Sequence, residues 1–85
     1  MTTKYIEETK QIQFDPHDWK GIHELMNRHE EFKNMCIGNN EEGESVTISI
    51  NKENITVTTL QSNGWVRENI YHRDYEVEEL YHKPH

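Results

Sequence analysis

The sequence has few of the residues that cross-link a chain or carry it through a membrane. Cys36 is the only cysteine among the 85 residues, so an intrachain disulfide is excluded and a reducing compartment is indicated. No apolar run approaches the ~20 residues that a membrane helix needs, and the N-terminus lacks the apolar core of a signal peptide. We therefore expect a cytoplasmic protein without a membrane partner.

Basic residues are also scarce. Nine lysines and arginines stand against 16 acidic residues, which gives a formal net charge of −7. A chain of this charge is repelled by the phosphates of nucleic acids and by anionic membranes. Direct nucleic-acid binding is therefore not expected, and the expected partner is a neutral or basic protein.

Sequence motifs of catalysis and metal binding are missing. No phosphate-binding glycine loop, nucleophile elbow or dinucleotide fingerprint occurs. His17, His23 and His29 are six residues apart, which scatters them around a helix, whereas ligand pairs need a spacing of three or four. His82 and His85 have that spacing but lie at the end of the chain. We expect no cofactor and no metal, and the chain is predicted not to be an enzyme.

Apolar residues are few for a folded chain. They make up 32% of the sequence, and the mean hydropathy is −1.08. A chain of 85 residues makes a single domain, residues 1–85, that buries roughly 60% of its unfolded surface. So small a core favours marginal stability or self-association. Residues 82–85 are expected to form a disordered tail.

The strongest structural signal that is present is a β-hairpin. Asn-Gly at residues 63–64, between two β-rich runs, predicts a two-residue type I′ turn. With that turn, Val57 lies opposite Ile70, and Thr59 lies opposite Glu68. The apolar partners then share one face of the sheet.

Two further turns extend this hairpin into a meander. The polar stretch after Ile50 predicts a second hairpin, in which Ile50 lies opposite Ile55. A tight turn at residues 73–74 adds a last strand, with Val77 opposite Ile70. Four consecutive antiparallel strands are therefore predicted between residues 45 and 81.

A helix is predicted before the meander. Asp15 can cap its free N–H groups, Pro16 suits its first position, and Gly38 suits its end. Gly21, within the helix, indicates close packing. The apolar stripe of this helix contains Ile22, Leu25, Met26, His29, Phe32 and Cys36. Residues 4–14 alternate weakly and are predicted to form an edge strand.

The elements are therefore expected in the order β-α-β-β-β-β. This is an α+β arrangement, in which one helix packs across a four- or five-stranded antiparallel meander. Such an arrangement carries no function by itself.

One row of the predicted sheet could carry chemistry. Thr59, Glu68 and Glu79 lie side by side on the face that the helix covers, where burial and like charge raise a carboxyl pKa. His29, from the helix stripe, could face this row. A small metal-dependent or acid/base enzyme using His29, Glu68 and Glu79 is therefore kept as an alternative. We favour the simpler interpretation of a core histidine and two glutamates at an open sheet edge.

The opposite face of the predicted sheet is unusually rich in residue types that dominate interfaces. These candidate partner-binding residues are Leu60, Trp65, Arg67, Asn69, Tyr71 and Leu80. A water-facing sheet surface more often carries threonine, lysine and glutamate. We therefore expect this face to bind a partner, although Trp65 and Leu60 could simply cap a thin sheet.

These features favour a small acidic, non-enzymatic protein-binding module that acts on a basic protein through an exposed aromatic sheet face. Its size and charge suit an inhibitor, such as an immunity-type protein or a phage or mobile-element protein. The aromatic face could instead form a homodimer. A structural homo-oligomer subunit is the third alternative.

Overall fold

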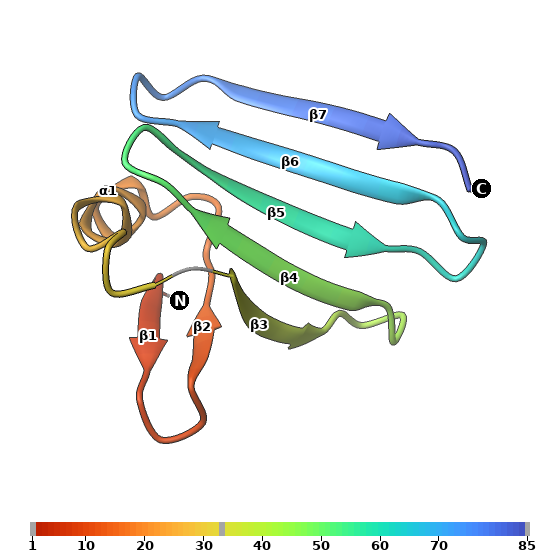
Figure 1. Cartoon of the computed structure of the whole chain (residues 1–85), viewed down its shortest axis with the longest axis horizontal. Helices are drawn as coiled ribbons and strands as arrows, with labels where there is room; N and C mark the ends of the chain where they lie inside the picture. Colours follow the sequence, from red (N-terminus) through yellow and green to blue (C-terminus); the bar gives the residue numbers. More distant parts are fainter. Residues whose placement is uncertain (1, 33, 85) are drawn as a thin grey trace.

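In the part of the chain that the computed structural model describes, residues 2–32 and 34–84, seven strands pair in chain order and one helix follows the second strand. The elements in Figure 1 are β1 (Lys4–Ile6), β2 (Gln11–Gln13), α1 (Trp19–Asn27), β3 (Asn34–Asn39), β4 (Ser45–Ile50), β5 (Asn54–Leu60), β6 (Val66–His72) and β7 (Val77–His82). Neighbouring strands are antiparallel except for β2 and β3, which are parallel. The predicted α+β class is confirmed, with two more strands than expected.

The first hairpin of the meander has the predicted register. Ile50 lies opposite Ile55, and Ile48 lies opposite Val57. The side chains of all four are buried on the face that α1 covers. β-Branched residues are stiff and pack well against neighbours on a pleated surface, so this pair of strands forms the centre of the core.

The predicted register between β5 and β6 is wrong by one residue. The turn has three residues, Ser62 to Gly64, and is closed by the hydrogen bond from the Gln61 N–H to the Trp65 carbonyl at 2.8 Å. Gly64 has a φ of +89°, so it takes the left-handed position that follows a type I turn. Asn-Gly suits this turn as well as the predicted one. The shift reverses the faces of β6, because side chains alternate along a strand.

The turn between β6 and β7 has the same design. Its closing hydrogen bond runs from the His72 N–H to the Glu76 carbonyl at 2.8 Å. Tyr75 takes the left-handed position, with a φ of 75°. Val77 therefore lies opposite Tyr71 and not opposite Ile70 as predicted.

Tyr75 offers a test of this turn. We expect Tyr75→Ala to be less stable than Tyr75→Gly, although alanine usually stabilises loops relative to glycine. Both variants lose the ring contacts to Trp19 and His23, at centroid distances of 5.2 and 4.9 Å. Only the alanine variant still has a Cβ at positive φ, which costs about 1–2 kcal/mol. Urea unfolding measures the order, and equal stability would show that the turn does not hold residue 75 at positive φ.

The helix begins later than predicted. Asp18 is the N-cap of α1, because its carboxylate accepts a hydrogen bond from the Gly21 N–H at 3.2 Å. Asp15, the predicted cap, accepts one from the His17 N–H at 3.0 Å in the turn before the helix. Either aspartate can accept from a backbone N–H two or three residues ahead, so composition alone does not choose between them.

The helix also ends earlier than predicted. α1 ends at Asn27, where the next N–H groups bond three residues back and tighten the last turn. The chain then returns as β3, so Cys36 is exposed on a strand instead of lying in a helical stripe. Met35 and Ile37 pack against the core from this strand. Side chains two residues apart lie on the same face of a strand, which is why both can reach the core from β3.

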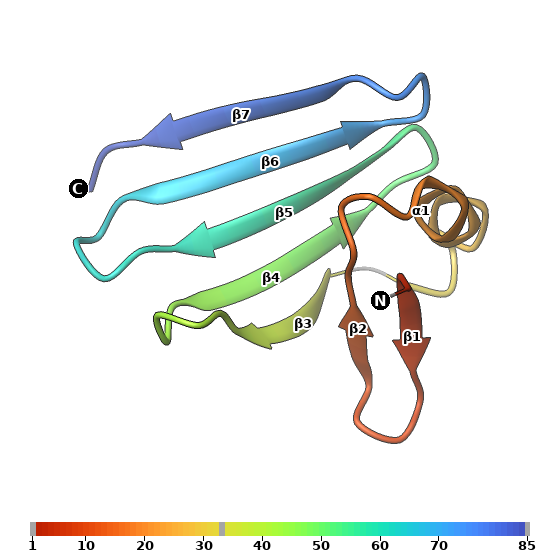
Figure 2. The same ribbon diagram turned by 180° about the vertical axis from the view of Figure 1, so that it is seen from behind.

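The predicted edge strand at residues 4–14 is a hairpin, β1 and β2, turned at Glu7–Lys10. β2 joins the sheet through the pair Gln11 and Cys36. Figures 1 and 2 show this hairpin beyond β3, inclined to the long strands of the meander.

The core lies between α1, the β1–β2 hairpin and the central strands. Its buried apolar side chains are Ile12, Ile22, Leu25, Met26, Phe32, Val46, Ile48, Ile50, Ile55 and Val57. Each side chain of this size contributes about 1.5–3 kcal/mol when it is fully buried. No helix within residues 2–32 and 34–84 is long and apolar enough to cross a membrane. His82 is the last residue of β7, and residue 85 of the predicted tail lies outside the described residues.

Candidate functional site

A groove of about 410 Å³ opens on the helix side of the sheet. Strands β4, β5 and β6 form its floor, and the segment after β2 and the end of β3 with its following loop form its walls. Its lining residues are Phe14, Pro16, Ile37, Asn39, Asn40, Val46, Val57, Thr59, Arg67, Asn69 and Tyr71. A volume of this size lies within the range of about 300–1,000 Å³ found for ligand pockets.

The groove exists because α1 covers only one end of the long strands. Figures 1 and 2 show α1 at the end where β4 stops and β5 begins. Tyr71 marks the boundary, since its ring contacts Phe14 at 4.9 Å and Trp19 at 6.1 Å between centroids. Burial raises the pKa of the Tyr71 phenol. Beyond Tyr71, toward the turn between β5 and β6, the floor of the sheet has no helical cover.

Among the described residues that line the groove, Arg67 is the only charged one. It is partly buried between Thr59 of β5 and Tyr81 of β7. Its Nε atom is buried and has no hydrogen-bond partner. No carboxylate of the described residues forms an ion pair with its guanidinium. The Tyr81 hydroxyl is a side-chain group that interacts with the guanidinium.

Glu79, on β7, affects the pKa values of Tyr71 and Tyr81, as Arg67 does, but it makes no ion pair with Arg67. Its carboxylate accepts a hydrogen bond from Asn69 Nδ2 at 3.2 Å and another from the Tyr81 hydroxyl. The bond to Glu79 is the main cause of the raised pKa of Tyr81, and Arg67 acts in the opposite direction. Neutral donors thus occupy the carboxylate that could have neutralised the arginine.

Glu44 is engaged in the same way. Its carboxylate accepts hydrogen bonds from Asn40 Nδ2 and from the Ser62 N–H, both at 3.0 Å. These two bonds lower the pKa of Glu44, and the charge of Arg67 adds a smaller effect. Glu44 therefore orders the loop at the groove wall and leaves the arginine unpaired.

Arg73 shows how an arginine is used when it is structural. It lies at a depression of about 400 Å³ lined by Glu53, His72, Arg73 and Asp74. Its Nε and Nη2 atoms donate to the Lys52 carbonyl at 3.0 and 2.7 Å, and Nη2 also donates to Asn27 Oδ1 at 3.2 Å. This arginine ties α1 to two turns of the meander. Its hydrogen bonds are made within the chain, in contrast to Arg67.

The predicted partner-binding residues do not form one surface. The register shift places Trp65, Arg67, Asn69 and Tyr71 on the helix side of the sheet, and the last three line the groove. Leu60 and Leu80 lie on the opposite face, where they are 52% and 42% exposed. The prediction that all six share the face away from the helix is therefore wrong.

The predicted row of His29, Glu68 and Glu79 is not assembled. Glu68 lies opposite Leu80, and Glu79 lies opposite Asn69, so the two carboxylates point to opposite faces. Glu68 pairs with His82 at 2.9 Å. His29 follows the helix, and its Nδ1 lies 3.0 Å from the Met26 carbonyl. Within residues 2–32 and 34–84, no three histidine, cysteine or acidic side chains are grouped as a metal site would require.

The residues of the groove walls were not singled out as candidate site residues from the sequence. Phe14 was assigned to an edge strand, Pro16 and Ile37 to the two ends of a helix, and Asn39 and Asn40 to no element. The signal that could have revealed them is the spacing of Met35 and Ile37, which fits a strand beside β4.

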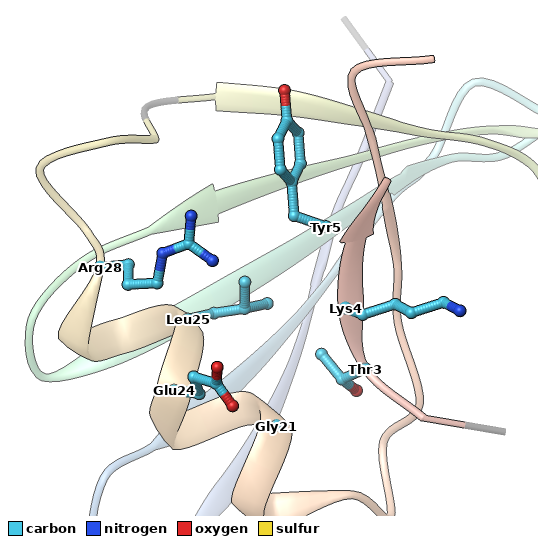
Figure 3. Close-up of a pocket in the computed structure, with 7 residues that line it drawn as sticks. All are labelled: Thr3, Lys4, Tyr5, Gly21, Glu24, Leu25 and Arg28. Carbon is cyan, nitrogen blue, oxygen red and sulfur yellow. The ribbon is translucent and has the colours of Figure 1, made fainter. Parts of the chain in front are cut away.

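A smaller cavity of about 150 Å³ lies between α1 and the start of the chain. Figure 3 shows Thr3, Lys4 and Tyr5 on one side and Gly21, Glu24 and Leu25 of α1, with the helix C-cap Arg28, on the other. The Thr3 N–H donates to Asp18 Oδ2 at 2.8 Å, and this bond is the main cause of the lowered pKa of Asp18. The cavity marks a structural contact between the helix start and the N-terminal strand.

Gly21 makes this contact possible, and Gly21→Ala tests it. Helix propensity alone favours alanine by ~1 kcal/mol. An added Cβ would, however, lie 2.5 Å from Asp18 Oδ2 and 2.7 Å from the Thr3 carbonyl oxygen. We expect the clash to dominate and the variant to lose about 1–3 kcal/mol in thermal or urea unfolding. The exposed Lys20→Ala is the control and should change stability little; a stabilised Gly21→Ala would contradict the close approach.

Arg67 should reduce the stability of the isolated protein. We expect Arg67→Met, which keeps the long apolar stem, to stabilise the chain by about 1 kcal/mol, because it removes a buried donor without an acceptor. The matched variant Arg73→Met should destabilise the chain, because it breaks three hydrogen bonds. Urea unfolding compares the two. If both variants lose stability to the same degree, Arg67 is a structural residue.

Comparison with known proteins identifies no relative: no family model, curated protein or solved structure matches the chain. Its function is therefore argued from the groove alone.

Proposed function

We propose that this chain is a small protein-binding module whose groove receives a carboxylate-bearing segment of its partner. The proposal rests on one observation: Arg67 has a buried Nε without an acceptor and makes no ion pair, and it is the one charged residue among the described residues that line the groove. A buried donor without an acceptor costs free energy, and a ligand carboxylate removes that cost. Hydrogen bonds between a guanidinium and a carboxylate are also about twice as strong as neutral ones.

The groove lining suits a carboxylate that is carried beside an apolar group. Phe14, Ile37, Val46, Val57 and Tyr71 supply apolar surface around the arginine. Apolar contacts that exclude water strengthen a central charged contact, as in the energetic centres of protein interfaces. A Glu or Asp side chain, or a chain terminus, flanked by aliphatic residues matches this lining.

The net charge of −7 constrains the rest of the partner. An acidic chain attracts a basic surface and repels an acidic one, so the partner is a neutral or basic protein that offers one carboxylate at the contact. An inhibitor or immunity-type protein that neutralises a basic target has this character. Association with such a target would be fast and salt-sensitive.

The proposal is tested with short synthetic peptides followed by NMR of the labelled protein. Acetyl-Leu-Glu-Leu-amide is compared with the matched Leu-Gln-Leu and Leu-Lys-Leu peptides and with acetate. We expect the Glu peptide alone among the peptides to shift the resonances of Thr59, Arg67 and Tyr71. Binding of acetate without the peptide would indicate a small-molecule carboxylate site. No shift in the groove with any carboxylate would contradict the proposal.

Two arginine variants locate the binding. Arg67→Met should weaken binding of the Glu peptide at least about tenfold, since a hydrogen-bonded charge contributes about 1.5–3 kcal/mol. Arg28→Met is the matched control. Arg28 is the C-cap of α1, pairs with Glu31 and does not line the groove. Equal loss in both variants would show that the peptide responds only to net charge.

A further inference from the structure

β7 is an uncovered edge of the sheet. All six of its residues are exposed, including Val77 at 52%, Leu80 at 42% and Tyr81 at 54%. Figure 1 shows no segment beyond it. Natural proteins usually shorten, bend or cover such an edge. β1, at the opposite edge, has only three residues, whereas β7 is a regular strand of six.

The hydrogen-bond pattern shows which backbone groups of β7 are free. The bond from the His72 N–H to the Glu76 carbonyl makes these two residues a hydrogen-bonded pair. Bonded and non-bonded pairs alternate along an antiparallel ladder, so Glu78 and Leu80 bond to β6. The N–H and carbonyl groups of Glu79 and Tyr81 therefore point outward. They can bond to another strand.

The side chains of β7 complement a second β7 in one antiparallel register. A two-fold axis perpendicular to the sheet relates the two copies so that side chains on one face of β7 meet side chains on the same face of the second β7. With Leu80 on the axis, Leu80 meets its own copy, Glu78 lies opposite His82 of the partner, and Glu79 lies opposite Tyr81 of the partner. With Glu79 on the axis, two carboxylates would lie directly opposite each other, which is destabilising.

We infer that two copies of this chain associate through β7, in the register that places Leu80 on the two-fold axis. In that register Glu79 and Tyr81 form the hydrogen-bonded pairs, and Leu80 meets its copy at a non-bonded position, where side chains approach more closely. An interface of one short strand per copy is small, so the dimer is reversible and forms with rising concentration. The inference is independent of the groove, which stays open in both copies.

The mass in solution tests this dimer. Sedimentation equilibrium over a wide concentration range should show a rise from the 10.2 kDa monomer toward twice that mass. Leu80→Lys places two like charges on the axis and should hold the chain at the monomer mass. Leu60→Lys is the control, since Leu60 is also exposed on the same face but lies on β5. A monomer at every concentration, or a dimer that survives Leu80→Lys, would overturn the inference.

Cysteine variants test the register in a Cys36→Ser background. Leu80→Cys places two thiols at a non-bonded cross-strand pair, with Cβ atoms about 4.5–5.5 Å apart. Dissolved oxygen, as the oxidant, should convert these thiols to an interchain disulfide seen on a non-reducing gel. Glu79→Cys should not form one, because its copies are displaced along the strands. Cross-linking of Glu79→Cys but not of Leu80→Cys, or of neither, would contradict the register.

Discussion

A nine-residue helix has to cover one face of a seven-stranded sheet, and most features of this protein follow from that mismatch. The helix is roughly 14 Å long. Seven strands spaced ~4.8 Å apart extend over roughly 29 Å. α1 buries Ile22, Leu25 and Met26 over the central strands at one end, and the β1–β2 hairpin adds Ile12. The remaining part of the face becomes the groove, and β7 remains the open edge.

The conformation of one turn decides the chemistry of this groove. In the predicted two-residue turn, Glu68 would lie opposite Thr59 on the helix side, and the groove would hold a carboxylate. In the observed three-residue turn, Arg67 takes that place. Both turns need positive φ at Gly64, and they differ in whether Asn63 also adopts it. A change in one backbone conformation thus replaces a carboxylate by a guanidinium at this position of the floor.

The sequence predicted correctly what depends on local alternation. The β4–β5 register, the α+β class and the burial of Ile22, Leu25 and Met26 follow from patterns of two and of three to four residues. It predicted wrongly what depends on competition between such patterns. The stretch after Asn27 fits a helical stripe, but residues 34–39 form β3, which pairs with β4. Phe32, before β3, is buried against Tyr5.

The sequence identified Arg67 as a candidate from its residue type but placed it on the wrong face. It also grouped Arg67 with Leu60 and Leu80, which lie on the opposite face of the sheet. The walls of the groove were not predicted, because Phe14 and Ile37 come from segments whose strand assignments depend on each other. Asn39 and Asn40 carried no pattern at all. Tertiary pairing between β2 and β3 brings these residues to the groove.

The groove and the edge strand are related through the geometry of the sheet. A two-fold axis perpendicular to the sheet at β7 leaves the helix sides of both copies facing the same direction, so two grooves with their arginines would open on one surface. A partner that offers two carboxylate-bearing segments could then bind both, and its second contact would be intramolecular. Weak binding to each groove and weak association through β7 would reinforce each other. Binding of such a partner would favour the dimer, and formation of the dimer would favour binding of the partner.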